Sequence, residues 1–278
     1  MLQKIVRRLA ASHIAGSSIE SALDVSRRAV ANGWSTTLCI WNGPDGTPAL
    51  LFQEYRSLIE ALQKETGNFN LSLKTPSFHY DLELLRQIII LATKQKIGIE
   101  FDSHGPESAD RTLNFAQQLR PHCDRMTCSM PARWARSVQD ADWAVEHRIG
   151  VRIVKGQWND PEAPGLDYRE NYFNIIDRLA SRDTKVFVAT HQPSLAREAL
   201  HRLKQSGTPC ELEVMFSLPL EVTKIAERMD VPVRVFIPFG YPYLPYNISD
   251  AHTRPAIALW GIRNFLVGRP PRQYPLYK

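Results

Sequence analysis

The chain has 278 residues, 44% hydrophobic and 23% charged, a balance typical of a folded globular protein and not of a disordered chain, a collagen or a coiled coil. Its 34 Lys and Arg and 29 Asp and Glu give a net charge of only +5, scattered along the chain, so binding to nucleic acid is not indicated. No apolar run approaches the roughly 18 residues of a membrane span, and the basic N-terminus lacks the apolar segment of a secretory signal. We therefore expect a cytoplasmic protein without a transmembrane segment.

Short β-branched runs alternate with longer amphipathic stretches along the chain. This alternation predicts eight strands, at residues 35–41, 69–74, 97–102, 124–130, 150–156, 185–191, 210–216 and 231–238. It also predicts one helix before them, at 18–32, and eight helices at 50–66, 79–95, 107–121, 133–147, 168–181, 193–206, 219–229 and 254–266. Strict alternation requires parallel strands with crossover helices, so the predicted fold is a (β/α)8 TIM-like barrel with an extra N-terminal helix.

The predicted barrel is a single domain over residues 1–268, because the alternation leaves no place for a boundary. The extra helix would either plug the N-terminal mouth of the barrel or pack on its outer ring. Residues 269–278 contain Pro270, Pro271 and Pro275, which predicts an extended or disordered tail.

The four cysteines do not suggest a disulfide framework or a metal site. Cys39, Cys123, Cys128 and Cys210 form no CxxC pair, and they are too few for disulfide stapling of a chain this long. We expect them to be reduced and mostly buried. Potential metal ligands come in pairs without a third at recognisable spacing, so no metal is predicted.

In a barrel of this kind, reactive groups come from the C-terminal ends of the strands and the loops after them. Polar residues predicted at these ends, and expected to converge on one mouth, are Lys74, Asp102, Arg152, Lys155, Thr190, His191, Gln192, Glu211 and Glu213. Each has a structural alternative, since a charge at a strand end can be solvated or paired inside the barrel. His191 taken alone fits a structural role better than a catalytic one. No P-loop, GxGxxG or GxSxG motif is present.

Several strand segments together resemble the proline dehydrogenase family of flavin-dependent barrels. The matching pieces, in family order, are SHIAGSSIESALDVSRRAVANGWSTTL, LSLKTPSF, IEFDS, VRIVKGQW, VFVATHQP, CELEVMF and PVRVFIPFG. VRIVKGQW and VATHQ are the most specific, and they lie on successive strands. The resemblance covers most of the chain and implies a non-covalent FAD across the barrel mouth.

The resemblance also implies roles for individual residues. The positions that match cofactor contacts are Ser103, Cys128, Arg152, Val154, Lys155, Gly156, Thr190, His191 and Gln192. Lys74 and Asp102 match positions that would orient the substrate and set its protonation, and Arg152 would lie at the reactive edge of the flavin. Because Arg152 is predicted at a strand end, we expect its replacement by alanine to impair flavin reduction or retention far more than folding.

The substrate side departs from the family pattern. Tyr246 and Asn247, preceded by Pro245, stand where the family has two arginines that clamp the proline carboxylate. Arg254 would replace that charge only if the helix shifted. In strand eight, Phe236 stands where the family commonly has tyrosine, and in strand four Cys128 replaces a flavin-contacting glutamine.

These departures predict that ordinary free proline is not the substrate. Residues expected at the substrate are Lys74, Tyr243, Tyr246 and Asn247, and the aromatic ones suggest a larger, less acidic amine. The predicted reaction is hydride transfer from a carbon next to nitrogen to FAD, giving a C=N product. The sequence leaves open whether a quinone, oxygen or a partner protein accepts the electrons.

Three alternatives stay open. The first is a flavin-binding or regulatory barrel without turnover. The second is canonical oxidation of L-proline to pyrroline-5-carboxylate with a rearranged carboxylate site. The third is a barrel aldolase or lyase in which Lys74 or Lys155 forms a Schiff base, which the flavin-type motifs oppose.

Overall fold

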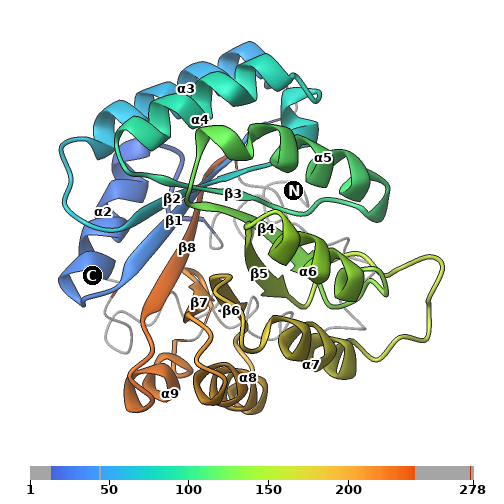
Figure 1. Ribbon diagram of the computed structural model, residues 1–278. Coiled ribbons are helices and arrows are strands. Elements are labelled where there is room, and N and C mark those ends of the chain that lie inside the picture. Colours follow the sequence, from blue (N-terminus) through green and yellow to red (C-terminus); the bar gives the residue numbers. More distant parts are fainter. Residues whose placement is uncertain (1–13, 44, 219, 242–275, 277–278) are drawn as a thin grey trace, which may run out of the picture.

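Eight parallel strands close into a barrel in the order β1 to β8, as the alternation predicted (Figure 1). The computed structural model describes residues 14–43, 45–218, 220–241 and 276. The strands are β1 Ser35–Trp41, β2 Phe69–Leu73, β3 Gly98–Phe101, β4 Met126–Pro131, β5 Gly150–Val154, β6 Val186–Ala189, β7 Cys210–Met215 and β8 Val233–Gly240. Their ends differ from the predicted ends by no more than two residues.

The helices form a layer outside the barrel. They are α2 Ile19–Ala31, α3 Pro48–Leu62, α4 Leu82–Lys94, α5 Ala109–Leu119, α6 Ser137–Glu146, α7 Tyr168–Leu179, α8 Pro193–Gln205 and α9 Thr223–Arg228. The short 3-10 turns are η1 Thr75–Phe78, η2 Pro106–Ser108 and η3 Arg120–His122. The helix predicted at 254–266 and the predicted domain end at residue 268 lie outside the described residues.

Local sequence fixes where several helices begin. The Asp81 side chain caps α4 by accepting a hydrogen bond from the Leu84 N–H at 3.0 Å. Thr47 caps α3 in the same way, with Pro48 at the first helical position. These caps satisfy N–H groups that have no partner inside the helix.

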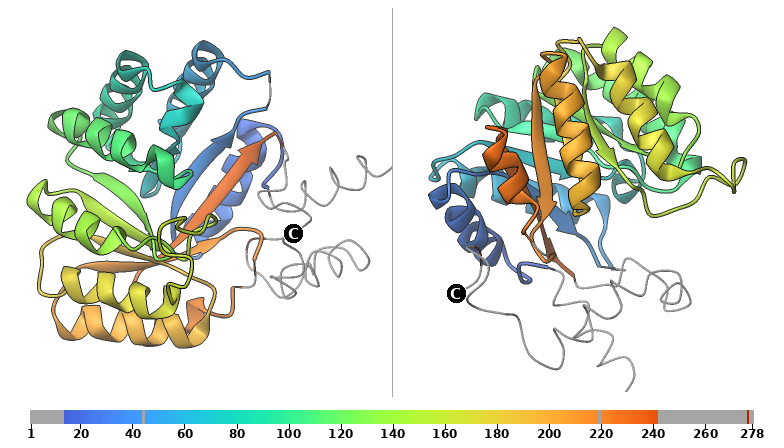
Figure 2. Two further views of the ribbon diagram at one scale, coloured as in Figure 1. Left: turned by 90° about the vertical axis from the view of Figure 1, so that its right-hand side faces the viewer. Right: turned by 90° about the horizontal axis from the view of Figure 1, so that it is seen from below.

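The extra N-terminal helix packs on the outer ring, which decides between the two placements that the sequence allowed. Helix α2 lies against β8 and β1 (Figures 1 and 2). The hydroxyls of Ser26 and Thr36 are hydrogen-bonded at 2.9 Å across this contact, and the Arg28 guanidinium donates to the Leu276 carbonyl at 2.9 Å. The helix therefore covers the β8–β1 seam of the barrel.

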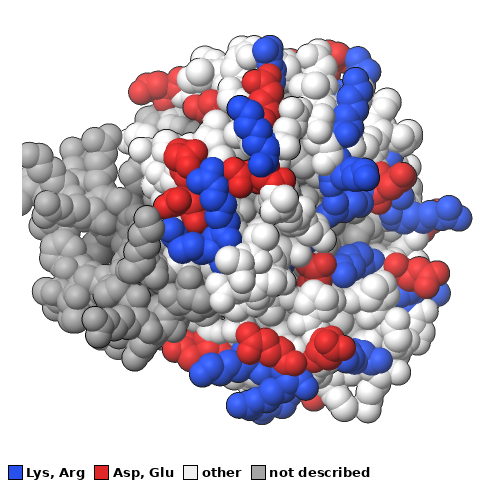
Figure 3. All heavy atoms as spheres, turned by 90° about the vertical axis from the view of Figure 1, so that its left-hand side faces the viewer, with Lys and Arg blue, Asp and Glu red and all other residues white. Residues whose placement is uncertain are grey.

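The outward faces of the strands and the inward faces of the helices form one apolar core. Among the described cysteines, all four are buried free thiols, as expected. On the outer surface, basic and acidic side chains are intermixed (Figure 3), as in the 2.7 Å pair of Arg86 and Glu83. None of the helices described is both long and apolar enough to cross a membrane.

The N-terminal end of the barrel is closed by a buried ion pair. The Arg234 side chain is 1% exposed, and its Nε donates to Glu211 at 2.9 Å. Lys185 lies 3.1 Å from the other oxygen of Glu211. The expectation that Glu211 joins the mouth is therefore wrong, because Glu211 comes at the start of β7 and Arg234 at the start of β8, at the opposite end from the mouth.

Candidate active site

Arg152 is the centre of a charged cluster inside the barrel. Its Nε donates a hydrogen bond to the Glu213 carboxylate, and its Nη1 lies 3.3 Å from an Asp102 oxygen. Nη1 also donates to the Ser129 hydroxyl at 3.2 Å, and the guanidinium carbon lies 4.7 Å from the centre of the Phe236 ring. Arg152 therefore contacts the side chains of four residues: Glu213, Asp102, Ser129 and Phe236.

The alternation of side chains along each strand brings these groups together. Arg152 is the third residue of β5 and is in register with Ser129 of β4. Glu100 and Asp102 lie two positions apart, so their side chains leave the same face of the chain and point into the barrel. Glu213 of β7 completes the group from the opposite wall.

Lys74 joins this cluster at the end of β2. Its ammonium lies 4.0 Å from the second oxygen of Asp102 and 5.6 Å from the centre of the Trp41 ring. Both side chains of the Lys74–Asp102 pair are 17% exposed, so they lie nearer the opening than Arg152, whose side chain is 9% exposed. The structure thus brings the three residues predicted as catalytic into one chain of contacts.

Arg152 does not lie at the strand end, so the premise for expecting its replacement to affect folding little is wrong. It lies inside β5, and two of its partners, Glu213 and Glu100, have side chains that are 1% and 0% exposed. Burial alone would lower the pKa of Arg152, but Glu100, Glu213 and Asp102 together raise it above its ordinary value. The guanidinium therefore compensates charge that the barrel has buried.

A second group of predicted residues lies at the ends of β5 and β6. The Lys155 ammonium lies 4.1 Å from the centre of the Tyr168 ring, and the Tyr168 hydroxyl accepts a hydrogen bond from Gln192 Nε2 at 3.0 Å. The Thr190 hydroxyl accepts from the Gln192 backbone N–H at 3.1 Å. The ring of His191 accepts from the Met215 N–H at 2.8 Å, a bond that ties β6 to β7.

Gln192 carries an unsatisfied acceptor in this group. Its side-chain oxygen is buried and accepts no hydrogen bond from the residues that the structure describes. A buried amide oxygen without a donor is costly, since burial removes its bonds to water. Gln192 also precedes α8 without capping it, so the first N–H groups of that helix receive no bond from this side chain. Both features suit a polar ligand at this end of β6.

Gly156 follows Val154 and Lys155 at a point where only glycine fits. Its φ is +88°, and a Cβ placed there would lie 2.7 Å from the Cβ of Pro131. Backbone without a side chain at a strand end can approach a ligand closely.

Replacing Gly156 by alanine is expected to lower the free energy of unfolding by more than the about 1 to 2 kcal/mol that a left-handed backbone costs an alanine. The excess reflects the contact with Pro131. Gly33→Ala is the matched control, because Gly33 has φ +77° with nothing within 4 Å of the added Cβ. Urea unfolding of both variants measures the difference, and equal losses would contradict the contact.

Two predicted cofactor contacts do not join either group. At this place on β4 the side chain of Ser129 points into the barrel. The side chain of Cys128 points outward, because consecutive strand residues point to opposite faces. Cys128 instead lines a cavity of about 20 Å³ outside the barrel wall, together with Ser103 and Asp140. The assignment of Cys128 to the mouth is therefore wrong, and burial raises the pKa of its thiol. The predicted substrate residues Tyr243, Tyr246 and Asn247, and also Pro245 and Arg254, lie outside the described residues.

Glu100, Ser129 and Tyr168 were missed by sequence reasoning. Glu100 carries a signal, since it lies two positions before Asp102 and is a charged residue in an apolar strand. Ser129 and Tyr168 carry none, because their roles depend on the register of β4 with β5 and on where α7 begins.

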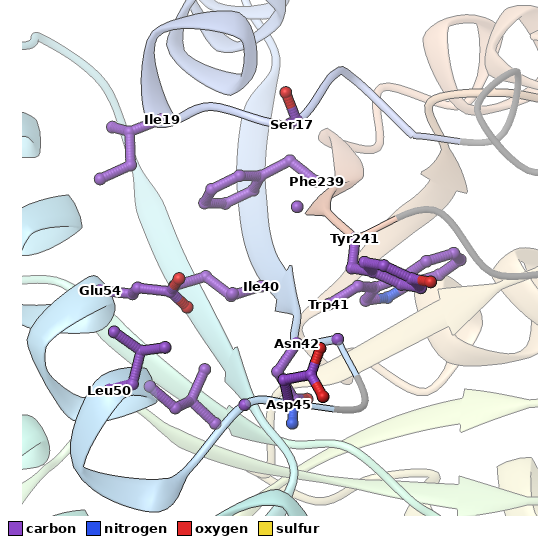
Figure 4. A pocket seen from close by; sticks show the side chains of 14 residues that line it. Ser17, Ile19, Ile40, Trp41, Asn42, Asp45, Leu50, Glu54, Phe239 and Tyr241 are labelled. Atoms are coloured by element: carbon purple, nitrogen blue, oxygen red, sulfur yellow. The ribbon is translucent and has the colours of Figure 1, made fainter.

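A larger pocket of about 530 Å³ lies between α2, α3 and the ends of β1 and β8 (Figure 4). Ile40, Phe239 and Tyr241 line it, and the Glu54 carboxylate points into it. Burial raises the pKa of Glu54. Among the residues that the structure describes, none of those predicted for the site lines this pocket.

No cluster of three or more potential metal ligands occurs among residues 14–43, 45–218 and 220–241. The described part of the site is built from carboxylates, the three cations Lys74, Arg152 and Lys155, hydroxyls and aromatic rings. Such a set can hold an organic ligand, compensate developing charge and move a proton.

Known proteins with a similar sequence share the length of this chain. Proline dehydrogenase 1 of Bacillus subtilis (strain 168) is 22% identical over 271 residues, covering 91% of this chain and 89% of that protein. The protein of the same name from Bacillus subtilis subsp. natto matches to the same extent. No family model matches the sequence.

Solved structures confirm the fold. Proline utilization A from Bdellovibrio bacteriovorus, inactivated by N-propargylglycine, has a TM-score of 0.76 at 16% identity and covers 97% of this chain. Proline utilization A from Bradyrhizobium japonicum has a TM-score of 0.67 at 17% identity, also over 97% of this chain. This chain spans 34% and 32% of the length of those two proteins. The resemblance to proline dehydrogenases thus covers nearly the whole chain, at low sequence identity.

Proposed function

We propose that this divergent relative of the proline dehydrogenases is an FAD-dependent oxidoreductase that removes a hydride from a carbon next to nitrogen in an amine or imino acid. The observation that carries the proposal is the match to proline dehydrogenase 1 over 91% of this chain and 89% of that protein. It is supported by the position of the two most specific motifs, whose polar residues end the adjacent strands β5 and β6.

The residues at these strand ends fit a flavin cofactor. The buried Gln192 oxygen lacks a hydrogen-bond donor among the described residues, and Gly156 leaves room for a close approach to the backbone. The N-terminus of α8, which the Gln192 side chain does not cap, suits a phosphate. The residues that would hold the cofactor are Arg152, Val154, Lys155, Gly156, Thr190, His191 and Gln192. When bound, FAD supplies the hydride acceptor.

Lys74, Asp102 and Arg152 would act on the substrate from the open side of the cluster. A hydride leaves readily only when the neighbouring nitrogen is neutral, because its lone pair stabilises the developing cation. The Asp102 carboxylate would accept the amine proton, and Lys74, 4.0 Å away, would hold that carboxylate in place. Arg152 would present a fixed positive charge where negative charge develops in the reaction.

The charges in this cluster support a substrate other than free proline. Lys74 and Arg152 each already have a carboxylate partner, and three carboxylates, Glu100, Asp102 and Glu213, surround them. Asp102 lies at Lys74, whereas all three carboxylates lie at Arg152, so a substrate carboxylate would compete with carboxylates of the protein at either cation. Tyr243, Tyr246 and Asn247 stay predictions for the substrate side.

The absorption spectrum of the purified protein tests the proposal. We expect a yellow protein whose flavin band is bleached anaerobically by at least one member of a panel of secondary amines and imino acids. A yellow protein that no amine bleaches would favour a binding or regulatory barrel. If the protein is colourless and borohydride traps a Schiff base between it and a carbonyl substrate, this result would favour the lyase and overturn the proposal.

Canonical oxidation of L-proline is the second candidate, because the relatives with full-length similarity are proline dehydrogenases. The Schiff-base alternative gains no support from the geometry. Lys155 lies over the Tyr168 ring and Lys74 beside Asp102, and both settings stabilise the charged ammonium, whereas a Schiff-base lysine must be neutral.

A further inference from the structure

Glu100 is the most completely buried acidic side chain of the charged cluster. Its side chain is 0% exposed, and neither carboxylate oxygen accepts a hydrogen bond within the described part of the chain. The nearest cationic atom is Arg152 Nε, 3.5 Å from one of its oxygens. A charged carboxylate in such a place is costly unless donors surround it.

Two carboxylates compete for one N–H group. Arg152 Nε carries a single hydrogen, which Glu213 accepts, while Nη1 serves Asp102 and Ser129. The other oxygen of Glu213 accepts from the Thr37 hydroxyl at 3.3 Å. Glu213 therefore has the donors that an ionised carboxylate needs, and Glu100 has none of them.

The surroundings of Glu100 also favour its protonated form. The charged and titratable groups that interact electrostatically with Glu100 are Asp102 on its own segment, Cys39 of β1, Cys128 of β4, Arg152 of β5, Glu213 of β7 and Arg234 of β8. Burial raises the pKa of Glu100 well above its ordinary value, and Glu213 and Asp102 raise it further against the opposing effect of Arg152.

We propose that Glu100 is a neutral carboxylic acid beside Arg152, and that it is a positioning residue for Arg152 in the site. With the Glu100 proton present, Arg152 and Lys74 balance Asp102 and Glu213, so the cluster is neutral. Loss of the proton leaves one excess negative charge next to Arg152. The ionised Glu100 then weakens the positive charge that Arg152 presents toward the mouth.

The pH dependence of stability tests the proton directly and needs no cofactor. A carboxyl group with a raised pKa in the folded state binds its proton more tightly there than in the unfolded chain, so stability falls as pH rises above the unfolded pKa of about 4.3. Glu100→Gln removes this loss. Between about pH 5 and pH 8, the unfolding constant of the unmodified protein should rise relative to that of Glu100→Gln by up to tenfold for each pH unit.

Glu211→Gln is the matched control at the other end of the barrel. Arg234 and Lys185 lower the pKa of Glu211, although its burial acts to raise it. Its stabilising effect is therefore present above the unfolded pKa of about 4.3 and is lost as pH falls below it, so the ratio of unfolding constants for this variant should stay constant between about pH 5 and pH 8 and change only at lower pH, with the opposite sign. A ratio of unfolding constants for Glu100→Gln that does not change with pH would overturn the proposal.

Two further measurements keep the proposal testable if Glu100→Gln does not fold. In the unmodified protein at neutral pH, the infrared spectrum should show the C=O stretch of a buried protonated carboxyl group, and its absence would overturn the proposal. Glu213→Gln keeps an acceptor for Arg152 and removes the competing charge. That variant should lose the infrared band at a lower pH than the unmodified protein, and an unchanged titration of the band would contradict the charge interaction between Glu213 and Glu100.

The consequence for catalysis rests on the proposed function. In the flavin-loaded protein, the rate of flavin reduction should decline as Glu100 loses its proton, and Glu100→Gln should remove this decline at high pH. Persistence of the decline in Glu100→Gln would overturn the positioning role. A protein without flavin would instead overturn the proposed function, while the stability and infrared measurements would still decide the protonation of Glu100.

Discussion

Replacing Arg152 by alanine is expected to lower the free energy of unfolding by about 3 to 5 kcal/mol, because it leaves buried carboxylates without their cation. Glu213, which accepts the Arg152 Nε–H, has a side chain that is only 1% exposed. Glu100 lies 3.5 Å from the same nitrogen and is fully buried. Denaturant unfolding at neutral pH measures the loss, with the slope of the transition checked against the unmodified protein.

Two comparisons show whether this loss comes from buried charge. Arg152→Ala combined with Glu213→Gln should recover part of the stability, because the uncompensated charge is removed together with its partner. Arg56→Ala breaks a 3.0 Å pair with Glu60 whose side chains are 53% and 59% exposed, and it should cost less than about 1 kcal/mol. A loss for Arg152→Ala no larger than that for Arg56→Ala would show that the cluster does not depend on the guanidinium.

Free proline is expected to be oxidised with a kcat/KM about 100- to 10,000-fold below that of the best uncharged or larger secondary amine. The resemblance places Tyr246 and Asn247 where the family has its two carboxylate-binding arginines. Each charge-assisted bond contributes about 1.5 to 3 kcal/mol, and a tenfold change corresponds to about 1.4 kcal/mol. Steady-state kinetics with proline and an amine panel, using an artificial electron acceptor, measures the ratio.

Saturable, efficient oxidation of proline by the unmodified protein would contradict this expectation and assign the carboxylate to another cation, with Arg254 the first residue to test. The converse experiment replaces Tyr246 and Asn247 by arginine. That variant should improve kcat/KM for proline if Pro245 leaves the two side chains directed at the substrate. Its kcat/KM for uncharged amines should not rise, since those substrates have no carboxylate.

The sequence was sufficient to predict the architecture because each strand and helix of the barrel has its own local sequence pattern. Each strand is a short apolar run and each helix a longer amphipathic one, so the alternation alone predicted eight parallel strands. Helix starts were visible where a side chain acts on its own backbone, as at Asp81. The resemblance to proline dehydrogenases was also visible in the sequence, since the motifs of β5 and β6 are contiguous.

The sequence also identified Lys74, Asp102 and Arg152 as a group, because strand ends of a parallel barrel meet at one mouth. It did not show which face Cys128 takes, because a shift of one residue reverses every side chain of a strand. Nor did the sequence show that Glu211 and Glu213 lie at different ends of the barrel, because both occur on one strand, two positions apart. One pairs with Arg234 at the bottom of the barrel and the other with Arg152.

What only the tertiary structure decided is how charge is distributed inside the barrel. Glu100, Asp102 and Glu213 come from two strands on different walls, and Arg152 comes from a third. Distances between such residues depend on barrel closure and strand register, which no local pattern encodes. The sequence by itself thus determined the fold and predicted which residues meet at the mouth. Their pairing, and with it the burial of Arg152, followed from the packing of side chains from separate strands into one small interior.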